Sequence, residues 1–308
     1  MTETPTAGGP AQPCPPRLAM IYLVATTALW GVTFTAGKVA AGEASPFNAT
    51  LWRFVLAGLV LVPMAVKAAK GKPYLGLSWA SLPALILSGL SGLVLYNFFF
   101  LNGLRLIPAS RASVVVCGSP ALIYLGSVLF YGERLRAISV GGIALSIFGT
   151  AWAVSSGRPW ELWATGLSRG DLIMLMCPFC WATYSLLAKK VLKRDTPLAA
   201  NAWSCLAATL MMAAIVPASG GSLGEAAGYG LWTWVAIAFL GLGGSALAFT
   251  LFYQGILALG PHRAASFINL VPIFGILSGW LVLGETPGLS LFVGLAMILF
   301  GIRLVQSR

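Results

Sequence analysis

The chain repeats the stretch WGVTFTAGKVAAGEASPFNATLW of residues 30–52 as WATYSLLAKKVLKRDTPLAANAW at residues 181–203. At an offset of 151 residues, Trp30 pairs with Trp181 and Trp52 with Trp203, and a lysine and a proline between them align as well. At an offset of 152 a second run matches Gly103 with Gly255, Arg111 with Arg263, Pro120 with Pro272, Glu133 with Glu285 and Gly142 with Gly294. Matches at a nearly fixed offset indicate an internal repeat.

The composition places both copies in a membrane. Of the 308 residues, 58% are hydrophobic and only 9% are charged, with a mean hydropathy of +0.87, whereas soluble domains carry about 25% charged residues. Each apolar stretch is near the roughly 20 residues that a membrane-crossing helix needs. The sequence therefore predicts an all-α membrane protein with ten transmembrane helices, at residues 18–38, 47–69, 79–104, 109–131, 137–155, 171–188, 198–217, 231–259, 262–283 and 288–305.

Five helices per copy is an odd number, so the second copy must enter the membrane upside down. The loop charges agree with this prediction. The loop after the first helix holds Lys38 alone, whereas its counterpart in the second copy holds four basic residues. We therefore expect two inverted repeats, at residues 17–156 and 168–308, around a central cavity, which is an arrangement common in secondary transporters. A repeat kept for stability alone is the alternative.

Residues 1–16 are rich in proline and glycine, which predicts a disordered tail rather than a signal peptide. The net charge of +11 comes mainly from short loops, where basic residues set topology, so no nucleic-acid partner is expected. Most of these residues would lie inside if both termini are cytoplasmic. The sequence thus predicts a multi-pass protein of the cytoplasmic membrane, surrounded by lipid.

Polar and aromatic side chains inside the apolar stretches are the candidates for a substrate-binding site. Amides and hydroxyls suit the charged groups of a zwitterion, and aromatic rings suit an apolar side chain. The alternative is that the polar groups only connect packed helices. The candidates are Trp30, Thr33, Phe34, Tyr96, Asn97, Phe100, Asn102, Tyr124, Trp181, Tyr184, Tyr253, Gln254, Ser266 and Asn269.

Three further features bear on mechanism. Pro120 and Pro272 occupy equivalent positions and would act either as paired gating hinges or as static kinks. All eight carboxylates lie in the tail, in loops or at span ends, so we expect alternating access without a buried proton-coupling carboxylate. Arg53 is the one residue with a charge clearly inside a predicted span. Its side chain would snorkel to the outer surface or pair with a backbone carbonyl; the alternative is that it binds a carboxylate of the substrate.

Two motifs from enzymes are also present. Gly89-Leu90-Ser91-Gly92 has the form of an intramembrane serine protease motif, but its counterpart at residues 241–244 lacks the serine. Cys177 and Cys180 have redox spacing but lie within an apolar helix, where a thiolate is poorly stabilised. No metal-ligand or cofactor fingerprint occurs, so the prediction is a non-enzyme without a cofactor, with a membrane-embedded enzyme as the less favoured alternative.

The chain also resembles a known family. The paired tryptophans, Arg53-Phe54 in the second span, and Gly132-Glu133-Arg134 and Gly284-Glu285 after the fourth and ninth spans are similar to the EamA branch of the drug/metabolite transporter superfamily. The resemblance is greatest to YddG-type amino-acid exporters. It implies a central cavity and export of small metabolites, most of all neutral and aromatic amino acids, with a nucleoside or a lipophilic cation as the alternative cargo.

A possible contact between subunits concerns the fifth span. Its small residues Gly142, Ser146 and Gly149 share one face. Small side chains let helix backbones approach closely in membranes. This face would pack either within its own chain or against a second copy in a homo-oligomer.

Overall fold

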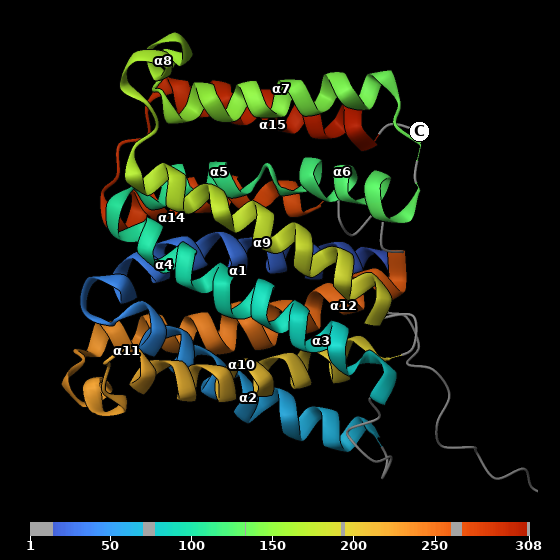
Figure 1. The fold of residues 1–308 in the computed structure, drawn as a ribbon, viewed down its shortest axis with the longest axis vertical. Coiled ribbons are helices and arrows are strands. Elements are labelled where there is room, and N and C mark those ends of the chain that lie inside the picture. Colours follow the sequence, from blue (N-terminus) through green and yellow to red (C-terminus); the bar gives the residue numbers. More distant parts are fainter. Residues whose placement is uncertain (1–14, 70–77, 133, 192–194, 260–266, 307–308) are drawn as a thin grey trace, which may run out of the picture.

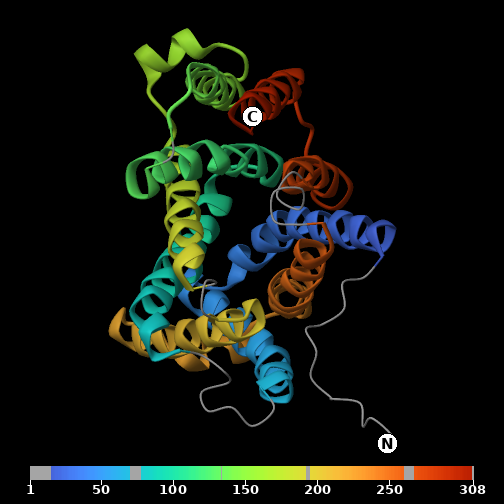
Figure 2. The same cartoon turned by 90° about the vertical axis from the view of Figure 1, so that its right-hand side faces the viewer.

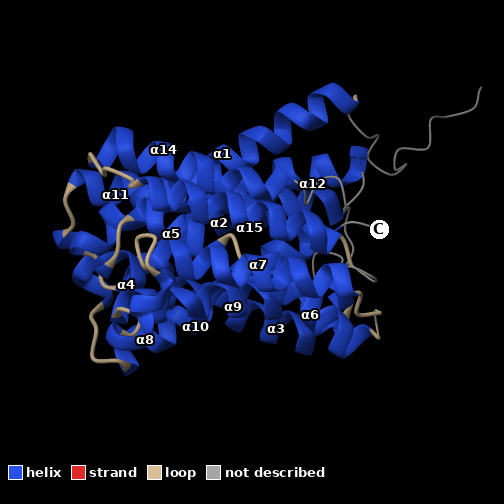
Figure 3. Cartoon of the chain, turned by 90° about the horizontal axis from the view of Figure 1, so that it is seen from above, coloured by secondary structure: helices blue, strands red, loops and turns tan. Residues whose placement is uncertain are grey.

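The apolar stretches form the long helices of the computed structural model, which describes residues 15–69, 78–132, 134–191, 195–259 and 267–306 (Figure 1). These residues contain no strand (Figure 3). Eight helical segments in this part are long and apolar enough to cross a membrane. Two shorter apolar helical segments, Ile268–Leu283 and Leu289–Val305, follow them.

In the first half, several spans are single helices and others are interrupted. The third span changes to a wider π-helical turn in its middle, and the fourth span breaks between two helices. The elements are α1 (Pro16–Glu43), α2 (Pro46–Ala69), η2 (Trp79–Ser81), α3 (Leu82–Gly89), the π-helix η3 (Leu90–Leu95), α4 (Tyr96–Leu106), α5 (Ala109–Val116), α6 (Ser119–Tyr131) and α7 (Ala137–Val154).

The second half repeats these interruptions. A π-helical segment again lies in the middle of its third span, at the position equivalent to η3. The elements are η4 (Pro159–Glu161), α8 (Leu162–Thr165), α9 (Arg169–Val191), α10 (Pro197–Ala218), η5 (Leu223–Gly228), α11 (Leu231–Ala238), the π-helix η6 (Phe239–Leu247), α12 (Ala248–Leu259), η7 (Ile268–Leu270), α14 (Val271–Leu283) and α15 (Leu289–Gln306).

Helices of the two halves pack against each other in pairs. α7 lies beside α15 at one edge of the molecule, and α2 packs on α10 towards the other edge (Figures 1 and 2). Between them, α1 contacts α12 and α14, while α4 contacts α9. The two halves are therefore interleaved, and the bundle interior is built from both.

The α7–α15 contact is made by glycine backbones. A Cβ atom on Gly142 would lie 2.4 Å from the carbonyl oxygen of Gly301, and one on Gly149 would lie 2.8 Å from that of Gly294. The earlier residue of α7 thus meets the later residue of α15, so the two helices are antiparallel. The small-residue face predicted for the fifth span packs within its own chain.

Acidic and basic side chains cap many helix ends at one end of the bundle. Arg105 at the end of α4 donates to the carbonyl oxygens of Ala41 and Ala44 at the end of α1, at 2.8 Å each. A Cβ atom on Gly170, in the first turn of α9, would lie 2.6 Å from the side chain of Ile107. α1 and α4 therefore finish where α9 begins. We name this end, with Glu43, Arg105, Asp171, Glu225 and Glu285, the capped end.

The carboxylates of the capped end satisfy helix N-termini, whose first N–H groups have no partner within the helix. Glu285 accepts from the backbone N–H groups of Ala109 and Ser110 at the start of α5, at 2.6 and 2.9 Å. Glu43 accepts from the backbone N–H of Gly230, just before α11, at 2.8 Å. Negative charge at these positions is also favoured by the helix dipole.

Two sequence predictions need correction, and a third falls largely outside the described residues. Pro120 and Pro272 were expected within helices, but they lie in the first turns of α6 and α14. Proline is tolerated there because its missing N–H would have no partner anyway. The first span continues past Lys38 to Glu43. Residues 1–14 of the predicted tail lie outside the described part.

Candidate functional site

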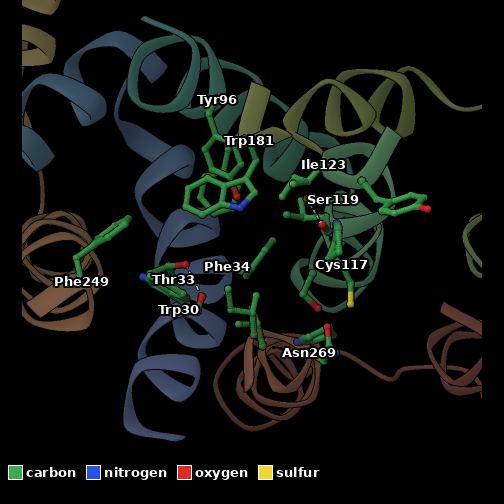
Figure 4. A pocket seen from close by; sticks show the side chains of 18 of the residues that line it. Trp30, Thr33, Phe34, Tyr96, Cys117, Ser119, Ile123, Trp181, Phe249 and Asn269 are labelled. Carbon is green, nitrogen blue, oxygen red and sulfur yellow. Dashed lines mark hydrogen bonds between the residues drawn. The ribbon is translucent and has the colours of Figure 1, made fainter. Parts of the chain in front are cut away.

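A cavity of about 460 Å³ lies between the two halves. Its wall comes from α1, α2, α4, α5, α6, α9, α12, η7, α14 and α15, which project side chains towards a common space (Figure 4). Many of the residues selected from the sequence lie there: Trp30, Thr33, Phe34, Tyr96, Phe100, Tyr124, Trp181 and Asn269, together with Pro120 and Pro272.

Other selected residues do not line the cavity. Asn97 is buried and Asn102 donates to the carbonyl of Phe98 in its own helix, at 2.8 Å. Tyr184 packs against Trp181, with ring centroids 5.2 Å apart. Gln254 lies on α12 and is not among the residues that line the cavity. The side chain of Tyr253, and Ser266 altogether, lie outside the described part.

Aromatic rings form one wall of the cavity. Trp30 lies with its ring centroid 5.2 Å from that of Phe249, and Tyr96 lies 5.8 Å from Trp181. The indole N–H of Trp30 donates to the carbonyl of Gly244 at 3.0 Å, which fixes the ring against η6. Phe249 was not selected from the sequence, although it lies one helical turn before Tyr253 and would follow from i, i+4 spacing.

Arg53 does not snorkel to the surface. Its Nε donates to the hydroxyl of Ser245 at 3.0 Å, and its Nη1 donates to Oδ1 of Asn97 at 2.8 Å. The partners come from η6 and α4, and the guanidinium also lines the cavity. The expectation of snorkelling or of a backbone carbonyl partner is wrong, because side chains on two neighbouring helices hold the cation inside the bundle.

The cavity faces away from the capped end. Its lining continues along α6 through Tyr124 to Ser127, and it includes Val305 near the end of α15. Towards the capped end, Phe100 and Leu104 belong to a buried apolar core that fills the bundle. The cavity therefore extends away from the capped end and has an apolar floor on the side of the capped end.

The described lining contains no carboxylate. Asp171 and Asp195 are buried, but they lie at helix ends; Asp171 pairs with Arg111 at 2.5 Å. Among the described residues, no group of three potential ligands could hold a metal ion.

The motif that resembles a serine protease makes structural contacts. Ser91 donates to the carbonyl of Cys180 at 2.8 Å. A Cβ atom on Gly92 would lie 2.4 Å from the ring of Tyr184, so this position needs a glycine for packing. The motif at residues 89–92 thus connects the third span to α9.

The sequence profile of the EamA-like transporter family matches residues 17–155 and again residues 168–307. The chain belongs to the EamA-like transporter family. The two matches correspond to the two copies of a repeated unit, and together they cover nearly all of the described residues. The EamA family thus accounts for the internal repeat, the multi-pass helical architecture and the membrane-length apolar helices.

Named relatives of this EamA chain are transporters. It is 24% identical over 284 residues to the uncharacterized transporter YyaM of Bacillus subtilis, covering 92% of this chain and 91% of the relative. It is 24% identical to a probable terminal-alkyne amino-acid exporter of Streptantibioticus cattleyicolor, covering 94% of each. It is 27% identical over 224 residues to the aromatic amino acid exporter YddG of Ancylobacter novellus, covering 72% of this chain and 73% of the relative.

A solved structure shares the fold. A crystal structure of a protein 24% identical to this chain matches it with a TM-score of 0.65, covering 93% of this chain and 96% of the other. At this level of identity the match concerns the fold alone.

Proposed function

We propose that this EamA-family protein exports neutral amino acids, including aromatic ones, by alternating access. The observation that carries the proposal is the cavity between the two halves. It joins an aromatic wall to the cation of Arg53, and its described lining has no carboxylate. An aromatic amino acid offers an apolar ring and a charged backbone end to such a site. The names of two relatives, an aromatic amino acid exporter and a probable amino-acid exporter, agree with this cargo.

We also propose that ten membrane spans form two inverted repeats of five. The glycine contacts of α7 and α15 support this, because the offset of 152 exchanges Gly142 with Gly294 and Gly149 with Gly301. The contact of Gly142 with Gly301 then maps onto the contact of Gly294 with Gly149. Contacts that exchange in this way are expected of two copies related by a twofold axis, and antiparallel equivalent helices place that axis in the membrane plane.

A second reciprocal contact supports the same arrangement. A Cβ atom on Gly92 would lie 2.4 Å from Tyr184, and one on Gly244 would lie 2.6 Å from Thr33. Gly92 and Gly244 differ by 152 positions, and Thr33 and Tyr184 differ by 151. The third span of each half therefore meets the first span of the other half in the same way.

We propose that the protein lies in the cytoplasmic membrane. The distribution of basic residues among the loops favours cytoplasmic termini. In that orientation the capped end is extracellular, and the cavity faces the cytoplasm to receive substrate. Pro120 and Pro272, each starting the second part of a broken span, are then the hinges at which one end opens while the other closes. The lack of a described carboxylate in the lining favours movement down the substrate's own gradient, without proton coupling.

Flux in proteoliposomes tests this function. The full-length protein is reconstituted, and entry of radiolabelled phenylalanine, leucine, uridine and tetraphenylphosphonium is measured with and without a pH gradient. We expect saturable flux of the two amino acids, and no such flux in protein-free liposomes. The pH gradient should not drive accumulation of either amino acid. Flux of uridine or tetraphenylphosphonium alone would reject the amino-acid assignment. Accumulation driven by the pH gradient would reject uncoupled transport.

A Ser91→Ala variant in the same assay addresses the enzyme alternative. Because Ser91 only bridges to the carbonyl of Cys180, phenylalanine flux should stay within about twofold of the wild-type rate, as for loss of one neutral hydrogen bond between transmembrane helices. Abolished flux in a correctly folded variant would give Ser91 a chemical role.

A further inference from the structure

Arg53 carries the one charge among the described residues that line the cavity. It lies on α2, which begins at Pro46 at the capped end. At 1.5 Å per residue, Arg53 is about 10 Å along the helix. Its guanidinium is therefore set into the inner wall of the bundle, beside the aromatic rings.

The two protein groups that hold Arg53 are neutral, and their orientations are fixed. The amide nitrogen of Asn97 donates to the carbonyl of Leu93 at 2.6 Å, so its oxygen is left to accept from Arg53. The hydroxyl of Ser245 donates to the carbonyl of Leu240 at 3.1 Å, so its oxygen accepts from Nε. Both acceptors position the guanidinium without neutralising its charge.

Donor capacity remains on the guanidinium. An arginine side chain has five N–H donors, and the bonds to Asn97 and Ser245 use Nε and Nη1. Nη2 has no acceptor among the described residues. It lies near Gly244, where a Cβ atom would be 3.7 Å away, and the absence of a side chain there leaves that nitrogen accessible.

The charge also has no counter-ion in the described part of the chain. The ion pairs found there are Arg111 with Asp171 and Arg158 with Glu161. A cation inside a membrane protein without an anionic partner is costly, and such residues mark ligand sites or pathways. An anionic group entering the cavity would supply the missing partner.

We propose that Arg53 binds the carboxylate of the substrate, while Trp30, Trp181 and Phe249 receive its apolar side chain. The same segment, η6, holds both parts of the site: Trp30 donates to the carbonyl of Gly244, and Arg53 donates to the adjacent Ser245. Aromatic rings alone would also attract an organic cation, but the guanidinium beside them repels one. This inference rests on the proposed transport function and names its substrate class, which is a carboxylate with an apolar side chain.

Three probes of similar shape separate the contributions of the charges. L-Phenylalanine carries the carboxylate and the ammonium, 3-phenylpropionate carries the carboxylate alone, and L-phenylalaninamide carries the ammonium alone. Binding of each to the purified full-length protein is measured by titration calorimetry. We expect the two carboxylates to bind, and the amide to bind about 10- to 100-fold more weakly, as for loss of a charge-assisted hydrogen bond.

Two variants test the residue itself. Arg53→Gln should weaken binding of both carboxylates by about 10- to 100-fold. It should not weaken binding of the amide, because the charge that repels an organic cation is removed. Asn97→Asp keeps nearly the same side-chain shape but places an anion of the protein against Arg53. It should therefore weaken binding of both carboxylates and leave binding of the amide intact. Arg303→Gln, at an exposed position on α15, is the matched control.

The outcomes distinguish this inference from the proposed function. Equal binding of phenylalanine and its amide, or unchanged carboxylate affinity in both Arg53→Gln and Asn97→Asp, would overturn the role of Arg53 even if amino acids are transported. Binding of 3-phenylpropionate without any amino-acid flux would support the role of Arg53 and reject amino-acid export. Binding of none of the probes would overturn the carboxylate site.

Discussion

Trp30 and Trp181 meet edge to face at the cavity wall, with ring centroids 6.4 Å apart, although 151 residues of sequence separate them. They occupy the same position in the two copies of the repeat. The two halves therefore each contribute one indole to a shared aromatic surface.

Replacing one of these indoles should weaken substrate binding. The Trp181→Ala variant should lower phenylalanine flux at subsaturating concentration by about 2- to 12-fold, the equivalent of an aromatic pair worth about 0.5–1.5 kcal/mol. Trp181→Phe should keep most of the flux because it retains a ring. Trp232→Ala is the control, since that indole is 74% exposed on the outside of the bundle. Equal losses in Trp181→Ala and Trp232→Ala would argue against an aromatic binding surface.

The glycine contact between α7 and α15 should be sensitive to a single methyl group. In Gly142→Ala the new Cβ atom would lie 2.4 Å from a backbone oxygen of Gly301, and overpacking of this kind costs about 1–3 kcal/mol. Gly141→Ala adds the same methyl group to the adjacent residue, where nothing lies within 4 Å. The melting temperature in detergent should therefore fall for Gly142→Ala and hold or rise for Gly141→Ala. Equal melting temperatures would mean that the two helices separate easily.

Glu285 should keep the capped end closed. Its carboxylate accepts three hydrogen bonds from Ala109 and Ser110, and bonds to a charged group contribute about 1.5–3 kcal/mol each. The Glu285→Gln variant should therefore favour conformations that open at the capped end. The measurement is the rate at which a membrane-impermeant maleimide, added from that side, modifies Cys117 in the cavity wall, with other cysteines changed to serine.

The control for that experiment is Glu161→Gln, which alters an exposed ion pair of a short loop helix. Labelling of Cys117 that is equally slow in Glu285→Gln and Glu161→Gln would remove Glu285 from gating.

Acid should loosen the capped end through Glu225. Partial burial raises the pKa of Glu225, but hydrogen bonds from Ser45, Tyr229 and Asn48 outweigh it and hold the pKa below the ordinary value of 4.5. A carboxyl whose pKa is lowered by folding stabilises the protein fully above its unfolded pKa, and this contribution is lost as the pH falls through the folded pKa.

The measurement is the melting temperature of wild type and Glu225→Gln between pH 7 and about pH 3. Wild type should be the more stable at neutral pH, and the difference should shrink as the pH falls below 4.5. If the difference in melting temperature does not change with pH, the stabilisation by Glu225 comes from the shape of its side chain rather than from its charge.

The repeat offsets predicted more of the fold than any single motif did. They paired Gly142 with Gly294, and the structure places each of these glycines against the partner half. Composition alone gave the membrane-length apolar helices. The positions of Pro120 and Pro272 within their spans were not predictable in the same way, because an apolar run does not reveal where a helix stops and restarts.

Only half of the residues predicted on α4 line the cavity, and the reason is geometric. Sequence reasoning selected Tyr96, Asn97, Phe100 and Asn102 together. Tyr96 and Phe100 line the cavity, but Asn97 turns to Arg53 and Asn102 to its own helix. All four residues lie in α4, after the π-helical turn at residues 90–95. Tyr96 and Phe100 are four residues apart and share one face of the helix, whereas Asn97 and Asn102 lie off that face. Selection by polar or aromatic type alone does not distinguish these faces.

The floor of the cavity has an electrical consequence. Water that enters the cavity from the open side brings bulk solution close to Phe100 and Leu104. The membrane voltage then falls across the layer of protein between this floor and the capped end. Moving one elementary charge through 100 mV costs about 2.3 kcal/mol. A zwitterion has no net charge to move through this layer, and Arg53 stays attached to its helix. In the proposed orientation, releasing a neutral amino acid to the outside would leave the cell's voltage undisturbed.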